Sequence, residues 1–89
     1  MVDNYIPDED QISKLYREMY GRMFVYASSV LQNWHLAEEA VQDTFFIFCT
    51  KADEALKKEN PRGWLMRTLQ NVMRNMNRQR MMMNRLIMT

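Results

Sequence analysis

Apolar residues recur every three or four positions over the first third of the chain, as they do on the buried side of an α-helix. The series is Ile12, Leu15, Met19, Met23, Tyr26, Val30 and Leu31, and Tyr16, Tyr20 and Phe24 widen the same face. This spacing predicts a first helix over about residues 9–32. Pro7 disfavours helix at the residue before it, so residues 1–8 are predicted to form a loose N-terminal end.

A second apolar series follows after a short interruption and predicts a helix over about residues 34–52. Its buried side is Ala37, Ala40, Val41, Phe45, Phe48 and Cys49. Asn33 can cap the start of this helix, and Trp34 is predicted to act as an apolar wedge at the junction. Residues 53–59 contain no strong helix breaker. They are predicted to continue the helix, to form a short turn or to form a loop, with Leu56 as an anchor on the core.

The last third of the chain predicts one long amphipathic helix over about residues 61–85. Asn60 is a good N-cap, and Pro61 suits the first helical position. The core-facing stripe is Leu65, Leu69, Val72 and Met76. With 89 residues, 2 Gly and 2 Pro, the chain is long enough for one domain and poor in turn residues. The predicted fold is therefore an all-α, compact three-helix bundle over residues 9–89.

Charge divides the chain into an acidic body and a basic end. Residues 1–60 carry 6 Lys/Arg against 11 Asp/Glu, a net of −5, whereas residues 61–89 carry 6 Arg and no acid, a net of +6. At about 100° per residue, one side of the third helix gathers polar residues within a sector of about 60°. They are Arg67, Asn71, Arg74, Arg78 and Arg85. Arginine neutralises phosphate and asparagine can pair with base edges, so this face indicates a nucleic-acid partner.

The sequence offers little for catalysis, metal binding or membrane insertion. The adjacent carboxylates Glu38 and Glu39 point about 100° apart on a helix, and there is no Gly-rich phosphate loop. One cysteine and one histidine nearly exclude a zinc site, and Cys49 is expected to be a buried apolar residue. Neither an apolar signal core nor a run of about 18 apolar residues is present. The expectation is a cytoplasmic protein that is not an enzyme and uses no cofactor.

The end of the third helix is unusual. Residues 80–89 read Arg-Met-Met-Met-Asn-Arg-Leu-Ile-Met-Thr and place apolar side chains on too many sides for an isolated helix. This end is predicted to be either an interaction surface or a point at which a longer natural chain has been cut.

Two motifs together resemble the region 2 domain of bacterial RNA polymerase sigma factors, of the extracytoplasmic-function type within the sigma-70 family. The first runs from Ala37 to Phe45 as Ala-Glu-Glu-Ala-Val-Gln-Asp-Thr-Phe. The second follows Asn60 and places Trp64, Leu65, Arg67 and Asn71 in the order Trp-Leu-x-Arg-x-x-x-Asn. The resemblance spans roughly residues 12–80. It implies a transcription initiation domain that binds polymerase and recognises and melts the promoter −10 element.

The resemblance also implies a division of labour between helices. The second helix would dock on the clamp helices of the largest polymerase subunit, and the predicted polymerase-binding residues are Glu38, Glu39, Gln42 and Asp43. The third helix would hold the non-template strand. The predicted DNA-binding residues are Arg67, Asn71 and Asn75, with Arg74 and Arg78 as phosphate contacts and Arg62 in addition. Trp64 can stack on a base, but a core role is favoured.

Family members normally carry a second, helix-turn-helix domain, for which 89 residues leave no room. The chain is therefore expected to be a domain taken from a longer factor. An alternative is a helical protein-interaction module without DNA binding, which meets a regulator such as an anti-sigma factor. A third reading takes residues 62–89 as a basic helix on a membrane surface, although the core-facing Leu65, Leu69 and Val72 argue against it.

Overall fold

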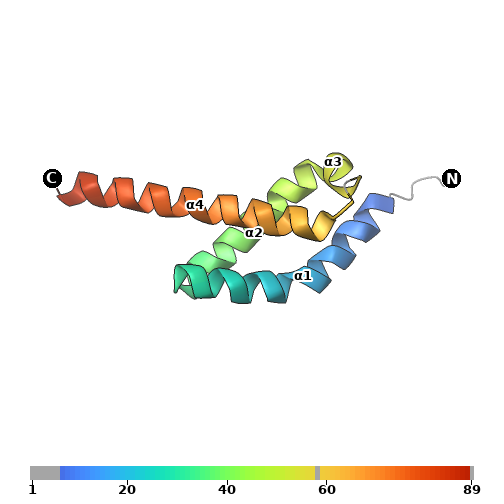
Figure 1. The fold of residues 1–89 in the computed structure, drawn as a ribbon, viewed down its shortest axis with the longest axis horizontal. Helices are drawn as coiled ribbons and strands as arrows, with labels where there is room; N and C mark the ends of the chain where they lie inside the picture. The colour runs from blue at the N-terminus through green and yellow to red at the C-terminus, as the bar shows by residue number, and fades with distance from the viewer. Residues whose placement is uncertain (1–6, 58, 89) are drawn as a thin grey trace.

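The computed structural model describes residues 7–57 and 59–88, and the side chains within 11–52, 54–57 and 59–87. The described chain forms four helices, which are α1 (Pro7–Leu31), α2 (Trp34–Thr50), α3 (Ala52–Leu56) and α4 (Pro61–Met88). Figure 1 shows α1 and α2 joined by a tight turn, with α4 crossing α2, running alongside the second part of α1 and extending beyond both at its C-terminal half. No strand occurs in the described ranges, so the predicted all-α fold is confirmed.

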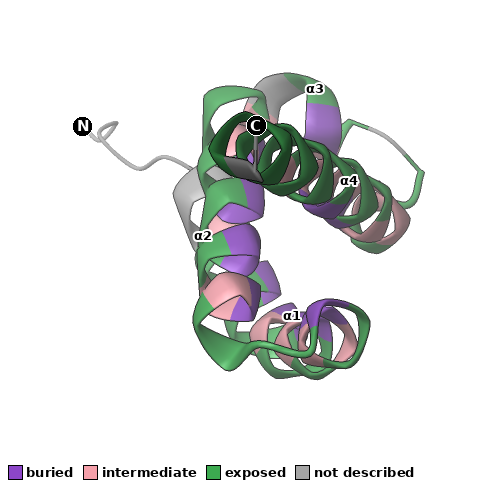
Figure 2. Cartoon of the chain, turned by 90° about the vertical axis from the view of Figure 1, so that its left-hand side faces the viewer, coloured by how far each residue is buried: buried purple, intermediate pink, exposed green. Residues whose placement is uncertain are grey.

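The core lies where one stripe of each long helix meets the others (Figure 2). The largest fully buried side chains are Met19 and Met23 from α1, Val41, Thr44 and Phe48 from α2, and Leu65 and Leu69 from α4. Thr44 is the polar member of this set. Its Oγ1 donates a hydrogen bond of 2.8 Å to the carbonyl oxygen of Ala40, so its burial leaves that hydroxyl paired.

Side chains cap the helices at both predicted positions. Asn33 Oδ1 accepts a hydrogen bond of 3.0 Å from the backbone N–H of Leu36, and Asn60 Oδ1 accepts one of 3.0 Å from that of Gly63. Each bond satisfies one of the donors that a helix start leaves open. Between α1 and α2, Gln32 adopts a left-handed φ of 52°, which reverses the chain in two residues.

Several sequence predictions are corrected by the structure. The second and third predicted helices end at Thr50 and Met88, and the connection between them contains the separate helix α3, in which Ala55 is buried and Leu56 packs on the core. The predicted loose end is shortened, because α1 begins at Pro7, and residues 1–6 lie outside the described part.

Two side chains predicted to be buried are exposed. Cys49 lies about 120° around α2 from the middle of its buried stripe, on the side that faces solvent. Trp34 is 58% exposed and stacks on the ring of His35, with a centroid separation of 3.8 Å, so it is not a wedge between helices.

Within the described residues, no helix combines the length and apolar character that a membrane crossing requires.

Candidate nucleic-acid interface

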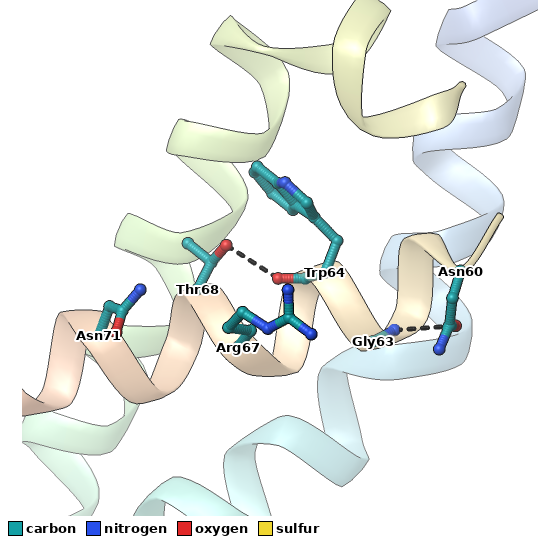
Figure 3. A pocket seen from close by; sticks show the side chains of 6 residues that line it. All are labelled: Asn60, Gly63, Trp64, Arg67, Thr68 and Asn71. Carbon is teal, nitrogen blue, oxygen red and sulfur yellow. Dashed lines mark hydrogen bonds between the residues drawn. The ribbon is translucent and has the colours of Figure 1, made fainter. Parts of the chain in front are cut away.

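A depression of about 410 Å³ lies along the first three turns of α4 (Figure 3). Its lining comes from α4 and the residue before it, namely Asn60, Gly63, Trp64, Arg67, Thr68 and Asn71. It therefore contains Arg67 and Asn71, two of the three residues predicted to contact the strand, together with the predicted N-cap Asn60.

The indole of Trp64 forms the apolar wall of this depression. The ring is half-buried and packs on Phe48 of α2 with a centroid separation of 5.5 Å, which agrees with its predicted core role. Thr68 Oγ1 donates a hydrogen bond of 2.8 Å to the carbonyl oxygen of Trp64, and this holds the threonine against the helix. The contact with Phe48 therefore anchors the indole of Trp64 on the core.

Gly63 leaves room for the side chain of Asn60 at the rim. A Cβ atom on Gly63 would lie 2.5 Å from Asn60 Nδ2, closer than two atoms can stand without moving. The absence of a side chain therefore allows Asn60 to bend over the helix start and accept its hydrogen bond from the Gly63 N–H.

The polar groups of the depression come from successive turns of α4. Arg67 and Asn71 are both exposed and lie four residues apart, on one side of the helix. Asn71 Oδ1 accepts a hydrogen bond of 3.3 Å from Arg74 Nη1, a bond that does not use the amide NH₂ of Asn71. A guanidinium, an amide and an indole edge in one depression match the charge, hydrogen-bonding groups and flat surface of a nucleotide.

The remaining candidates are not gathered at this depression. Arg74 and Arg78 are exposed further along α4 and continue the cationic face. Asn75 lines a different depression, between α2 and α4, where Asp43 also lies. The structure thus brings Arg67 and Asn71 together and sets Asn75 apart.

Arg62 is occupied by an ion pair within the protein. Its Nε donates to Glu18 Oε2 at 2.5 Å and its Nη2 to Glu18 Oε1 at 2.8 Å, a two-point contact that joins α4 to α1. The hydrogen bond lowers the pKa of Glu18 below its ordinary 4.5 and raises that of Arg62. The guanidinium predicted to contact DNA is thus paired, within the protein, with a carboxylate 44 residues earlier in the chain.

The Glu18–Arg62 pair makes a testable prediction about acid stability. Because the folded pKa of Glu18 is lowered, the pair stabilises the fold above pH 4.5 and this contribution is lost as the pH falls through the folded pKa. Glu18→Gln should therefore lower the melting temperature at pH 7 and make it less sensitive to acid, measured by circular dichroism from pH 7 to pH 3.

A matched control for this prediction is Glu39→Gln. It removes an exposed carboxylate that forms no ion pair with any residue in the described part of the chain. Equal melting curves for the two variants across the pH range would show that the pair does not stabilise the fold.

The acidic side of α2 forms a second surface. Three of the residues predicted to bind polymerase, Glu39, Gln42 and Asp43, are exposed on it. Glu38 is half-buried and turned towards α1. Burial chiefly raises the pKa of Tyr20, and the nearby carboxylate of Glu38 adds to the shift. Of the four predicted residues, three face outward.

Sequence patterns did not reveal Glu18 or Gly63 as parts of this region. The partner of Arg62 lies on another helix at a separation that no helical period links, and the importance of Gly63 depends on the rotamer of a neighbouring cap. The helix-start position of Gly63, three residues after Asn60, was the available signal for the latter.

Comparison with known proteins gives one family. Residues 15–81 match the family model described as Sigma-70 region 2. This match runs from the third turn of α1 to the sixth turn of α4 and includes the whole depression around Trp64. Neither a curated protein nor a solved structure matches the chain significantly.

Proposed function

The chain belongs to the Sigma-70 region 2 family, whose domains bind RNA polymerase and recognise the promoter −10 element, and from this premise we propose that the depression on α4 captures an unpaired base of the non-template strand. The observation that carries the proposal is the position of Arg67 and Asn71, exposed on one side of α4 beside the fixed indole of Trp64. The activity is binding rather than catalysis, since the family is one of transcription factor domains.

In this proposal the described residues offset the cost of opening the duplex. Unstacking a base costs a few kcal/mol. Hydrogen bonds from Arg67 and Asn71 to base edges would offset part of this free energy. The indole of Trp64 would provide an apolar surface on which the base can stack. Arg74 and Arg78 follow on the next turns of α4, where they meet the phosphates of the strand.

The acidic side of α2 is proposed to hold the polymerase. Glu39, Gln42 and Asp43 are exposed on a helix other than the one that carries Arg67 and Asn71, so one surface can bind protein while the other binds the strand. Carboxylates on a helix surface favour the Arg and Lys of a basic partner such as the clamp helices of the largest subunit. The domain would then act in the cytoplasm, as part of a factor of the extracytoplasmic-function type.

The salt dependence of strand binding tests the nucleic-acid part of the proposal. With about three to five phosphates neutralised, the slope of log K against log salt concentration should be roughly −2 to −3.5 for a single strand. The measurement is fluorescence anisotropy of a labelled single strand that carries a −10-type sequence, titrated with the 89-residue chain at several salt concentrations.

The same titration with a duplex of that sequence is the control, because captured bases must be unpaired. A slope near zero, or equal binding of strand and duplex, would contradict strand capture. Retained binding of polymerase clamp helices in that case would leave the protein-interaction module as the function.

A further inference from the structure

The ion pair between Glu18 and Arg62 has the geometry of a phosphate contact. Arg62 donates from Nε and Nη2 to the two carboxylate oxygens of Glu18, at 2.5 and 2.8 Å. These two bonds use one side edge of the guanidinium, and arginine binds the oxygens of a phosphate through the same kind of edge. The carboxylate of Glu18 therefore occupies a position at which two phosphate oxygens could bind.

The pair lies at the surface, so Arg62 can exchange its partner. The side chains of Arg62 and Glu18 are 48% and 36% exposed. An ion pair in contact with water contributes little to stability, because water solvates both charges when the pair opens. A phosphate that reaches Arg62 thus displaces a weakly held carboxylate.

The surroundings of the pair would be cationic without Glu18. The pair borders a depression of about 230 Å³ between α1, α3 and α4, and the other polar residues that line it are Gln11 and Lys14. Lys14 precedes Glu18 by four residues, so both lie on one side of α1. Glu18 is the acid in this lining, and its charge offsets that of one of the two cations. Removing that charge would leave Lys14, Arg62 and an amide around the depression.

This depression adjoins the one that is proposed to capture a base. Arg62 is followed directly by Gly63 and Trp64, which line the capture site, and it lies about 7.5 Å along the axis of α4 from Arg67. Its side chain lies about 140° around the helix from that of Arg67, on the side of α1. A strand that is held beside Trp64 and passes the start of α4 towards α1 therefore meets Arg62.

We propose that Glu18 occupies Arg62 in place of a phosphate and thereby limits the affinity of the domain for the strand, an inference that rests on the proposed function. The carboxylate takes one two-point edge of the guanidinium, and its charge repels a phosphate that approaches the remaining N–H groups. Loss of this carboxylate leaves Arg62 and Lys14 to bind one further phosphate. Glu18 thus sets the affinity without contacting the strand.

Strand binding by two single variants tests the proposal, with fluorescence anisotropy of the labelled −10-type strand as the measurement. Glu18→Gln should bind about fivefold more tightly than the unchanged chain at low salt, which corresponds to the strongest surface ion pairs. Its slope of log K against log salt concentration should be steeper by about 0.7, the value for one more phosphate on a single strand. Glu54→Gln removes the same charge from α3, where this exposed carboxylate forms no ion pair with a described residue. It should change the affinity less than about twofold and leave the slope unchanged.

A double variant separates the released guanidinium from the lost charge. Glu18→Gln combined with Arg62→Gln has the net charge of the unchanged chain and should bind the strand within about twofold of it, with the same slope. A gain that persists in the double variant would overturn the proposal, because Arg62 would then have no part in it. Equal gains in Glu18→Gln and Glu54→Gln, or weaker binding by Glu18→Gln than by the unchanged chain, would also overturn it.

Inorganic pyrophosphate tests the occupation of Arg62 without a strand. The Nε–H signal of Arg62 is followed by NMR during the titration and is assigned by its absence in Arg62→Gln. Glu18→Gln should bind pyrophosphate at this signal about fivefold more tightly than the unchanged chain. This result in a chain that binds no strand would support the occupation of Arg62 by Glu18 and would show that strand capture itself is wrong. Equal pyrophosphate affinities would overturn the present inference and leave strand capture standing.

Discussion

Phe48→Ala is expected to lower the free energy of unfolding by about 3–5 kcal/mol, the usual range for a buried phenylalanine. Phe48 is 0% exposed and lies where α2 meets α4, in edge contact with the ring of Phe45 and packed on Trp64. Domains of this size have free energies of unfolding on the order of 5–10 kcal/mol, so the variant loses a large share of its stability. Urea unfolding followed by circular dichroism measures the change.

The matched control lies two positions away on the same helix. Phe46→Ala removes the same side chain from a site that is 71% exposed, and it should change the stability by no more than about 0.5 kcal/mol. Similar losses in the two variants would mean that α2 does not present Phe48 to the core. A correct pair of results also supports the position of Trp64, whose ring rests on Phe48.

The three long helices were predictable because their buried residues follow the helical period. In α1, Leu15, Met19 and Met23 are buried at intervals of four, and the period alone identifies them as core. The caps were equally accessible, because Asn33 and Asn60 are short polar residues directly before an apolar series, and local hydrogen bonds fix both helix starts. These features depend on neighbours within four residues of each other.

Features that depend on distant partners could not be predicted in the same way. The helical period of α2 does not show where the edge of its buried stripe lies. Cys49 was therefore expected to be buried, whereas the structure exposes it and buries Thr44 near the middle of the stripe. Helix α3 is too short for a period to define it and is held by Ala55 and Leu56 on the core. Trp34 is a large apolar residue of the kind that is usually buried. Its exposure depends on the path of the turn between α1 and α2, which the helical period does not predict.

The candidate site was predictable in part for the same reason. Arg67 and Asn71 share one side of α4 because they are four residues apart, and the structure keeps them together at one depression. Arg62 has the same residue type and a similar position in sequence, but α1 brings Glu18 against it. The period determines which side of a helix a cation occupies, whereas the neighbouring helices determine which charged groups it meets.

Arg67→Ala combined with Asn71→Ala is expected to weaken capture of the −10 strand by about a hundredfold. Each good contact to a base edge contributes about 1–3 kcal/mol, and the pair lines one depression, so both contacts are lost from the same nucleotide. The measurement is the affinity of the chain, bound to core polymerase, for a single strand carrying the −10 sequence. Binding to polymerase itself should not change, because the residues proposed to bind it, Glu39, Gln42 and Asp43, lie on α2.

The chain contains a matched control for this double variant. Arg80 and Asn84 are the same residue types at the same spacing, thirteen residues further along α4, and both are exposed. Arg80→Ala with Asn84→Ala removes an equal charge and an equal amide, so it should cost only the long-range attraction of one arginine, about threefold in affinity. If the two double variants weakened strand binding equally, the net charge of α4 would account for the binding. The depression beside Trp64 would then have no reading role. A hundredfold loss confined to the first pair would instead require contacts made at that depression, because charge, residue type and spacing are the same in both variants.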